Sequence, residues 1–314
     1  MEDILGTHGI MFHHFHDNEK HIEEQGSISG EDFERILDYY EERYNLIDAY
    51  IYTYKALHNN LKDNDVCITF DDNLLCQYDV AIPILNKRNL SAFFFAYTSP
   101  IQGKAEKLEI YRHFRHLKFA DIDEFYDAFF ILYENKKKEL NVDVSVETQF
   151  DADNYLTQYS FYSLNDRKFR YYRDEVLGQF RYYQIMDSML EEYKYDIDKY
   201  SQILWCGSKE LKDICDHGHI VGLHSHTHPT RLCEYDYNDQ LNEYSICKEI
   251  LENCTGKKVM SASYPCGSIN DDTVPIMKKL GIEIAFKEIM IPYNSNLMIP
   301  REDHSNIMRR MKKG

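Results

Sequence analysis

The stretch HIVGLHSHTHP, residues 219–229, shows the pattern that decides the fold of this chain. A short apolar run, typical of a buried strand, ends in three histidines, His224, His226 and His228, that alternate with Ser and Thr. The helix-like DQLNEYSICKEILENCTG follows over residues 239–256, with its apolar positions at helical spacing. We therefore expect a strand, a polar loop and a helix in this order.

The same order recurs along the chain. The strand-like runs are GIMF (9–12), VCITF (66–70), SAFFFAY (91–97), VMSASY (259–264), EIAFKE (283–288) and LMIP (297–300). Strands that alternate with helices predict a parallel β/α architecture. Barrels and open sheets of this class both place their sites at the carboxyl ends of the strands. Because His and Asp residues gather at these ends, the sequence favours an enzyme.

One part of the chain departs from this order. Residues 103–202 show little strand pattern and are rich in aromatic and charged residues, and Ile122, Phe125, Phe129 and Leu132 fall on one helical face. We expect a helical, Tyr-rich insertion within a single domain that spans 1–314, because loops of that length are uncommon. Packing or homo-oligomerisation is its favoured role. The alternative is a lid or a substrate-recognition element, since tyrosines suit stacking against sugars.

Composition and charge narrow the class of protein. The chain has 314 residues, and its 53 acidic against 36 basic residues give a formal charge of −17. A protein that neutralises phosphates needs a basic face, so we expect no nucleic-acid partner, and anionic membranes are disfavoured. No apolar run approaches the roughly 18 residues that span a bilayer. The sequence opens without a signal-peptide pattern, and its eight cysteines lack CxxC spacing. These features predict reduced thiols in a cytoplasmic protein.

The three histidines indicate a metal site, but their spacing leaves the ligands open. In a straight strand they all point to the same side, and His224 and His228 lie about 13 Å apart. These two can share a metal only if the chain bends between them, whereas neighbours two residues apart can share one in an extended strand. The pairs 224/226, 226/228 and 224/228 all remain open, as does a solvated loop without metal.

Asp71 and Asp72 stand side by side after the strand-like run VCITF. Two adjacent carboxylates in a partly dry site repel each other unless one is protonated or a cation lies between them. A solvated turn or a helix N-cap is the alternative interpretation. Asn73 supports a turn, because Asn tolerates the left-handed conformation.

Taken in order, TFDD (69–72), HSHTHP (224–229) and SYPCG (263–267) resemble the three motifs of polysaccharide deacetylases, the NodB-homology enzymes of carbohydrate esterase family 4. AIPILNKRNLSAFFF at 81–95 resembles a helix and strand of the family, and IPRED at 299–303 resembles a late Pro-Arg element. The resemblance covers most of the chain outside the insertion. It implies a distorted (β/α) barrel of the NodB-homology type that carries a large helical insertion.

The resemblance also implies roles for the motif residues. Asp72, His224 and His228 would bind one divalent metal, Asp71 would be the general base, and His226 would lie behind the ligands or beside the substrate. Two imidazole nitrogens and one carboxylate oxygen leave positions open for water and substrate. Zinc is the favoured metal, and cobalt, nickel or manganese suit the same donors.

The general acid needs a separate argument, because the late Leu-His motif of the family has no obvious counterpart here. In circularly permuted relatives, the poly-N-acetylglucosamine deacetylases, this histidine lies in an N-terminal Tyr-His strand. IMFHHF at 10–15 resembles that strand, so the permuted form is the nearest. His13 is the expected acid and His304 its rival, while His14 is expected to be structural or to lie outside the first layer of the site.

Other positions differ from the family pattern. Cys266 stands where the family has the second aromatic of YPYG, so a sugar-facing ring is lost while a backbone N–H is kept. Tyr264 and Cys266 are expected at the substrate and the oxyanion. No Arg precedes this turn, and Arg301 is expected to tune Asp71 in its place.

The implied function is metal-dependent hydrolysis of an N-acyl group, favoured to be N-acetyl, on a sugar. The expected cytoplasmic location favours a nucleotide- or lipid-linked precursor of surface polysaccharide as substrate. A deformylase or another amide hydrolase on the same fold is one alternative. A catalytically silent sugar-binding or scaffold protein is the other, and Asp71 discriminates, because a structural metal site needs no free carboxylate beside its ligands.

Overall fold

The computed structural model describes residues 6–17, 19–157, 162–291 and 295–312. The chain divides into two compact units, Met1–Glu106 with Ser201–Gly314, and Lys107–Tyr200. The helical segment expected at 103–202 within a single domain is thus a compact unit of its own, with bounds a few residues away.

The first unit is built on a parallel sheet. Its strands are β1 (His8–Phe12), β2 (Asn45–Leu46), β3 (Asp65–Phe70), β4 (Phe93–Ala96), β5 (Ile220–Leu223), β6 (Ser261–Ser263), β7 (Ile284–Phe286) and β8 (Arg301–Asp303). The order in the sheet is β7-β6-β5-β4-β3-β1-β8, and β2 pairs with β3. A parallel bridge between Phe286 and Ile299 joins β7 to the segment that enters β8. The sheet therefore nearly closes into a distorted (β/α) barrel, which confirms the predicted fold class.

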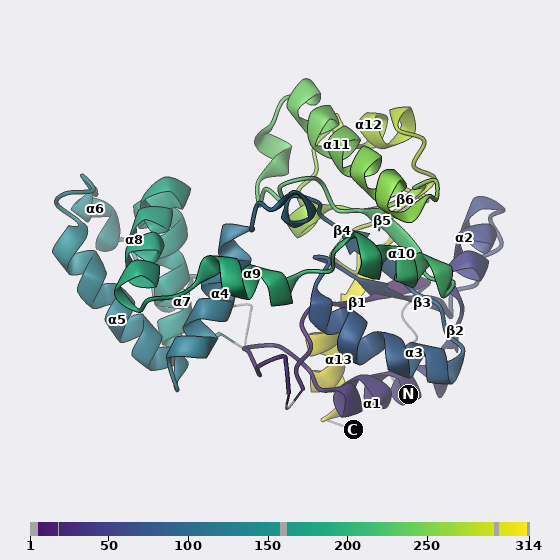
Figure 1. The fold of residues 1–314 in the computed structure, drawn as a ribbon, viewed down its shortest axis with the longest axis horizontal. Helices are drawn as coiled ribbons and strands as arrows, with labels where there is room; N and C mark the ends of the chain where they lie inside the picture. Colours follow the sequence, from purple (N-terminus) through teal and green to yellow (C-terminus); the bar gives the residue numbers. More distant parts are fainter. Residues whose placement is uncertain (1–5, 18, 158–161, 292–294, 313–314) are drawn as a thin grey trace. The chain divides into compact units, whose positions relative to one another are not determined.

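Helices surround this sheet (Figure 1). They are α1 (Gly30–Glu41), α2 (Ala49–Leu57), α3 (Ile82–Arg88), α10 (Ser208–Asp216), α11 (Tyr237–Thr255), α12 (Thr273–Lys279) and α13 (His304–Met311). Several begin at residues that cap a helix well: Asp236, for example, accepts the backbone N–H groups of Asn238 and Asp239. No helix within the described ranges is both long and apolar enough to cross a membrane.

Two glycines shape the interior of the barrel. A Cβ atom at Gly222 would lie 2.4 Å from Ser261 Oγ and 2.7 Å from the ring of Phe95. A Cβ atom at Gly9 would lie 3.1 Å from Cγ of Arg301, whose side chain is almost wholly buried. These positions on β5 and β1 thus leave room for an aromatic ring and for one long cationic side chain inside the barrel.

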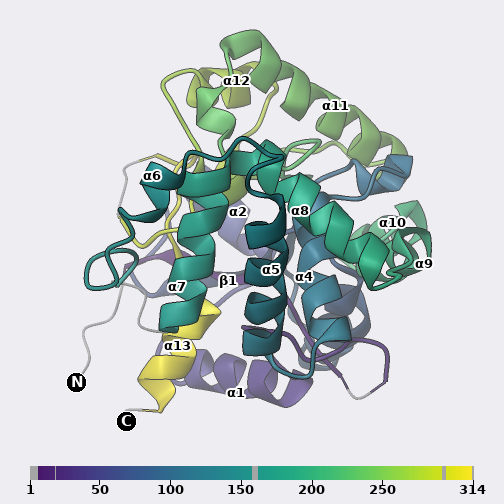
Figure 2. The same ribbon diagram turned by 90° about the vertical axis from the view of Figure 1, so that its left-hand side faces the viewer.

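The second unit is helical. It contains α4 (Lys107–Lys118), α5 (Ile122–Lys136), α6 (Val144–Glu147), α7 (Leu164–Tyr171), the π-helical turn η3 (Tyr172–Leu177) and α8 (Gly178–Glu192). Figures 1 and 2 show α4, α5, α7 and α8 packed as a bundle. The next helix, α9 (Ile197–Leu204), runs across the boundary into the first unit.

The aromatic residues of the second unit fill its own core. Phe125 and Phe129 are buried on the expected face of α5, whereas Ile122 and Leu132 lie at its margin and stay partly exposed. Tyrosine hydroxyls bond to carboxylates, as Tyr111 does to Asp187 at 2.6 Å. Much of the tyrosine content of 103–202 therefore serves packing within this unit.

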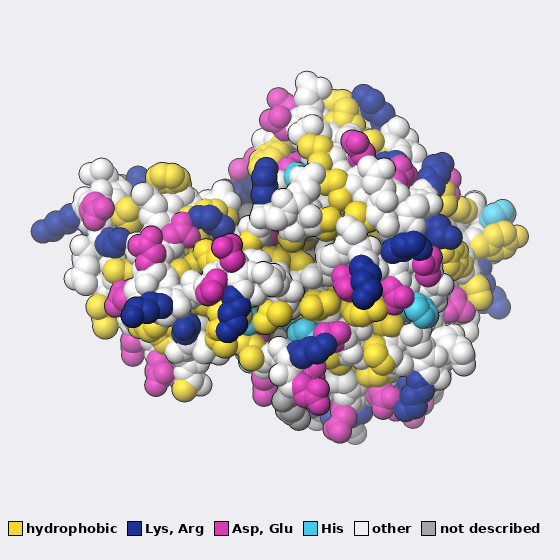
Figure 3. All heavy atoms as spheres, viewed as in Figure 1, with side chains coloured by type: hydrophobic (Ala, Val, Ile, Leu, Met, Phe, Trp, Pro, Cys, Tyr) yellow, Lys and Arg dark blue, Asp and Glu magenta, His cyan; other side chains and the backbone are white. Residues whose placement is uncertain are grey.

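Charge is mixed on the face of the barrel unit that Figure 3 shows. On the face shown in Figure 3, acidic and basic side chains alternate rather than gather by sign. All eight cysteines lie in the described part of the chain, and none of them forms a disulfide bond.

Candidate active site

The site residues predicted from the sequence lie at the carboxyl ends of the strands of the barrel. His13 follows β1, Asp71 and Asp72 follow β3, His224 follows β5, and Tyr264 follows β6. Because carboxyl ends of parallel strands meet at one edge, these residues share one end of the barrel.

A tight turn separates the two adjacent carboxylates. Asp72 and Asn73 both adopt positive φ, 79° and 57°, which Asp and Asn tolerate better than most residues. Asn73 is held on both sides by Cys206: its side-chain amide donates to the Cys206 carbonyl at 3.1 Å, and its own carbonyl accepts the Cys206 N–H at 2.9 Å. The turn directs Asp71 and Asp72 to different partners.

The histidine loop bends sharply. Ser225 and His228 adopt positive φ, 64° and 56°, and the His228 N–H donates to Ser225 Oγ at 3.1 Å. The ring centroids of His224 and His228 are consequently 5.0 Å apart, far closer than in a straight strand. The bend that a 224/228 pair requires is present.

Asp72 lies between these two histidines. Its Oδ1 atom is 3.3 Å from His224 Nε2 and 3.3 Å from His228 Nε2. The candidate ligand atoms of the three residues all lie within 4.8 Å of one another. Asp72 Oδ1 is buried and accepts no hydrogen bond from any described residue. A buried carboxylate oxygen that faces two imidazole nitrogens and lacks a donor fits a divalent cation.

The protonation of the two histidines suits this role. His224 Nδ1 donates to the Ser263 carbonyl at 2.9 Å, which leaves Nε2 directed toward Asp72. Burial lowers the pKa of His228 to about 4, so its ring is neutral at pH 7. Burial also acts to lower the pKa of His224, but the carboxylates of Asp71 and Asp72 outweigh it and the net shift is upward. Because the neutral imidazole is the form that binds a metal, binding at His224 Nε2 would compete with a proton.

Asp71 is held inside the barrel by three donors. Arg301 Nη1 and Nη2 donate to its two oxygens at 2.7 and 2.6 Å, and Ser263 Oγ donates to Oδ2 at 3.1 Å. Burial, the largest single influence, acts to raise the pKa of Asp71, but the charge and hydrogen bonds of Arg301 together with the nearby His224 and His13 outweigh burial, and the pKa lies below its usual range. Asp71 is therefore ionised at neutral pH, beside the cluster of Asp72, His224 and His228.

His13 approaches Asp71 from another side. Its Nε2 atom lies 4.0 Å from Asp71 Oδ2, and its side chain is partly exposed. His224 Nε2 lies 3.9 Å from the same oxygen. The Asp71 carboxylate thus lies between His13 and the candidate metal ligand His224.

His226 is turned away from this cluster. Its Nδ1 atom bonds to Thr98 Oγ1 at 2.9 Å, and its carbonyl accepts the N–H groups of Thr98 and Ser99. Its own N–H and that of Thr227 donate to one carboxylate oxygen of Glu243 on α11. These bonds hold the bent loop, so His226 positions the loop instead of lying among the candidate ligands.

His304, the rival acid, is enclosed. Its ring stacks on Phe12 with centroids 5.8 Å apart, and its Nε2 bonds to the Gly26 carbonyl at 3.1 Å. Burial lowers its pKa. His14 follows His13, and the rings of the two lie nearly parallel with centroids 6.4 Å apart. Of these three histidines, His13 is the one placed against Asp71.

The SYPCG turn is held in place by Tyr264. The Tyr264 hydroxyl donates to the Leu297 carbonyl at 2.7 Å and its N–H to the Phe286 carbonyl at 3.3 Å. Tyr264 is buried, so it supports the turn, which differs from the substrate contact expected of its side chain. Cys266 is exposed at the tip of the turn with φ 51°.

Sequence reasoning missed the residues that hold the site in shape. Ser263 orients both Asp71 and His224, while Thr98 and Glu243 hold the histidine loop. Ser263 lies within a quoted motif and could have been found as a hydroxyl at a strand end. Thr98 and Glu243 carry no local signal.

Comparison with known proteins agrees with this geometry. Residues 182–285, which contain the second and third motifs but not Asp71 and Asp72, match the profile of the polysaccharide deacetylase family. No curated protein matches the sequence. The resemblance inferred from the motifs is thereby confirmed over this range.

Solved structures share the fold at low sequence identity. The Streptococcus pyogenes deacetylase PplD in complex with acetate has a TM-score of 0.55 and 15% identity, over 98% of this chain and 99% of that one. IcaB from Ammonifex degensii has a TM-score of 0.54 and 14% identity, over 95% and 91%. The BpsB deacetylase domain from Bordetella bronchiseptica has a TM-score of 0.52 and 13% identity, over 96% of both chains.

Proposed function

We propose that this protein is a metal-dependent hydrolase that removes an N-acyl group, favoured to be N-acetyl, from a sugar. The match to the deacetylase family supports the reaction class. One observation carries the proposal further: the ionised, buried Asp71 lies beside three convergent ligand atoms, and His13 stands against it. A site that merely bound metal would not need this additional carboxylate.

Asp72, His224 and His228 would hold one divalent cation, and zinc is the metal we favour. When bound, such an ion supplies Lewis acidity that polarises the acyl carbonyl and favours deprotonation of water. Ser263 and the bent loop hold the two histidines for this purpose.

Asp71 would accept the proton of the attacking water. A carboxylate offers about four lone-pair sites, and Arg301 and Ser263 occupy three of them, which leaves one for a water molecule. The same donors fix the orientation of the carboxylate, so the remaining site keeps one direction.

His13 would protonate the departing amine. It reaches the site from β1, whereas the second and third candidate ligands follow β5, so the acid and the ligands come from separate strands. The backbone N–H of Cys266 is our candidate donor to the oxyanion.

The substrate we favour is an N-acylated sugar precursor inside the cell, linked to a nucleotide or a lipid. This rests on the sequence prediction of a cytoplasmic protein together with the deacetylase resemblance.

The test compares wild type with Asp71→Asn, both loaded with zinc and incubated with N-acetylglucosamine oligomers and nucleotide-linked N-acetyl sugars. Released acid and free amine are measured. We expect the wild type to release acetate, and Asp71→Asn to keep its metal but lose turnover by at least about 10². Asp216→Asn, an exposed carboxylate on α10, is the matched control. Release of formate from formylated analogues alone would favour the deformylase alternative. Metal-loaded wild type that releases no acid would favour the silent binding protein.

A further inference from the structure

Two arginines of the second, helical unit have buried donors without an acceptor. Arg115 lies on α4 and Arg170 on α7, and the Nε atom of each is buried and donates to no described residue. Buried polar groups are nearly always hydrogen-bonded, and a buried cation is costly unless an anion balances it. Each residue as a whole stays partly exposed, so the pair is not sealed from solvent.

The groups around Arg115 do not balance its charge. Burial acts most strongly to lower its pKa, and the positive charges of Arg112 and Arg170 lower it further. Tyr126 and Tyr182 act in the other direction, but the net shift of the pKa is downward. Of the described groups that act most on this pKa, none is a carboxylate. Arg115 and Arg170 are thus close enough to repel each other.

Two carboxylates of the same unit are engaged with other donors. Asp166 accepts the Tyr126 hydroxyl on one oxygen and a backbone N–H at 3.0 Å on the other. Asp174 accepts two bonds from Arg173, at 2.6 and 2.8 Å. These bonds are directed away from the buried Nε atoms of α4 and α7, which therefore keep their need for an acceptor.

Tyr182 on α8 adds a hydroxyl to this cluster. The Phe169 ring, which precedes Arg170 on α7, packs against the rings of Tyr126 and Tyr182 with centroids 5.2 and 6.0 Å apart. Burial raises the pKa of Tyr182 to about 12, so its hydroxyl keeps its proton at pH 7 and can donate a hydrogen bond. Cationic and hydroxyl donors from three helices, α4, α7 and α8, therefore gather within one unit.

These donors select the class of ligand. Two neighbouring guanidinium groups call for an anion with several acceptor oxygens and a charge near −2. A phosphate group carries about −1.5 to −2 at pH 7, and its oxygens match the planar fork of N–H donors on arginine. A chloride ion or a single carboxylate would balance only one of the two cations.

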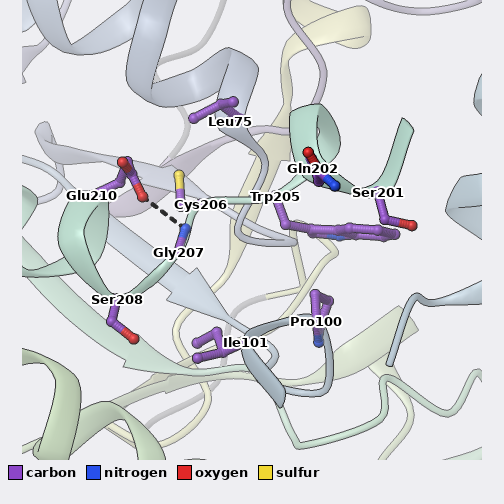
Figure 4. Close-up of a pocket in the computed structure, with 10 residues that line it drawn as sticks. All are labelled: Leu75, Pro100, Ile101, Ser201, Gln202, Trp205, Cys206, Gly207, Ser208 and Glu210. Atoms are coloured by element: carbon purple, nitrogen blue, oxygen red, sulfur yellow. Dashed lines mark hydrogen bonds between the residues drawn. The ribbon is translucent and has the colours of Figure 1, made fainter. Parts of the chain in front are cut away.

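A pocket in the barrel unit has the opposite chemistry (Figure 4). Its volume is about 340 Å³, and Leu75, Ile101 and Trp205 contribute apolar groups to its wall. Glu210 adds a carboxylate, and no Lys, Arg or His is among the described residues that line the pocket. Of these two places, only the arginine cluster offers cations to a phosphate group.

We propose that Arg115, Arg170 and Tyr182 form a binding site for a phosphate group in the helical unit. This site goes beyond the proposed hydrolase function and does not depend on it. Bound phosphate would join α4, α7 and α8 and relieve the repulsion between the two arginines. Free inorganic phosphate and a nucleoside diphosphate both supply this chemistry, and the experiment distinguishes the two sources.

The test is isothermal titration calorimetry of the full chain at constant ionic strength, with inorganic phosphate, uridine diphosphate or chloride as the titrant. The protein is first freed of metal with EDTA, so that phosphate cannot bind an ion held by the barrel. We expect one phosphate per chain with a Kd of about 1 mM or below, and no binding of chloride. A lower Kd for uridine diphosphate would assign the site to a nucleotide, and an equal or higher one to free phosphate.

Three variants test the assignment. Arg115→Met and Arg170→Met should each weaken phosphate binding at least about tenfold, and Tyr182→Phe about three- to tenfold. Tyr182→Phe conserves the volume of the ring and decides the question even if an arginine variant does not fold. Arg181→Met is the matched control, because Arg181 donates to the Leu140 carbonyl at 2.8 Å, and it should bind phosphate as wild type does.

Thermal melts provide a second readout. Phosphate should raise the melting temperature of wild type, because a ligand stabilises the state that binds it, and should leave that of Arg115→Met unchanged. Without phosphate, Arg115→Met should melt at or above the wild-type temperature, since the substitution removes a buried cation that no carboxylate balances.

Three results would overturn the site: absence of phosphate binding to wild type, equal binding of chloride, or a phosphate affinity that all three variants leave unaltered. None of them bears on the hydrolase proposal, which is measured on metal-loaded protein with a variant of the barrel unit. Conversely, phosphate binding that depends on Arg115 would stand even if the protein released no acid from any sugar.

Discussion

Arg301 donates hydrogen bonds to both carboxylate oxygens of Asp71, at 2.7 and 2.6 Å, although the two residues lie 230 positions apart in the chain. Both side chains are almost wholly buried. A buried carboxylate is costly unless it is paired and fully hydrogen-bonded, and a guanidinium meets that need with two parallel bonds. The charge of the proposed base is therefore maintained by a residue from the opposite end of the sequence.

Replacing Arg301 by Met should raise the pKa of Asp71, since burial then acts without the opposing charge. The wild-type acidic limb of kcat/KM should lie below the usual Asp range near 3.9, and the variant limb should move to higher pH. The unpaired carboxylate should also cost about 3–5 kcal/mol of stability. The pH dependence of kcat/KM measures the shift of the limb, and chemical denaturation measures the loss of stability.

Arg35→Met is the control for this variant, because Arg35 pairs with Asp32 on the exposed face of α1. It should lower the free energy of unfolding by less than about 1 kcal/mol and leave the acidic limb of kcat/KM at its wild-type pH. An unchanged limb in Arg301→Met would show that Asp71 does not govern the rate.

The wild type should bind nearly one zinc ion per chain. His224→Ala and His228→Ala should each lose this zinc, whereas His226→Ala should retain it. The bend in the loop gives the reason, since it brings only the first and third histidines to Asp72. Elemental analysis of the purified variants measures the metal. His226→Ala should still lower the free energy of unfolding by about 0.5–1.5 kcal/mol, because it removes the hydrogen bond to Thr98. Thr98→Val removes the same bond and should lower the stability by a similar amount. Loss of zinc from His226→Ala with zinc retained in Thr98→Val would make His226 a ligand.

His13→Gln should lower kcat on an N-acetyl sugar by about 10²–10⁴, because the amine then leaves without a proton donor. The loss should be much smaller on 4-nitrophenyl acetate, whose leaving group needs no proton. His304→Gln should change kcat only a few-fold but lower the melting temperature, since its ring packs on Phe12. The opposite pattern would assign the acid to His304.

Asp65 should make stability depend on pH. Its buried carboxylate accepts Asn45 Nδ2 at 2.6 Å, Lys55 Nζ at 3.0 Å and the Lys62 N–H at 2.9 Å. Burial acts to raise its pKa, but these donors outweigh burial and the folded-state pKa is lowered. The stabilisation is therefore complete above the unfolded pKa near 3.9 and is lost as the pH falls through the folded value.

Asp65→Asn should accordingly lower the free energy of unfolding by about 1–3 kcal/mol at pH 7. This difference in stability from wild type should shrink below about pH 4. Urea denaturation at several pH values measures it. A difference that stays constant down to pH 3 would show that Asp65 is not the titrating group.

The fold was largely predictable because its signals are local. Each strand is a short apolar run, each helix has its own periodicity, and the alternation of the two leads to a parallel barrel. The same local order placed Asp71, Asp72 and His224 at strand ends, which meet at one end of any parallel sheet.

The choice among the three histidines was not predictable in this way. Spacing alone left three pairs open, and the resemblance favoured His224 and His228. The bend that joins them depends on bonds from the loop to Thr98, which is 128 residues away in sequence, and to Glu243 on the following helix. Tyr264 shows the same limit: its side chain is buried by contacts with the remote Leu297 rather than directed to the site.

The sequence by itself determined which residue types stand at the strand ends, because strand and helix periodicities are written in neighbouring residues. Only the tertiary structure decided which of them meet, since Arg301 reaches Asp71, and Trp205 reaches Tyr97, across long stretches of chain. Such distances depend on how strands and loops pack together, and packing is a property of the whole barrel.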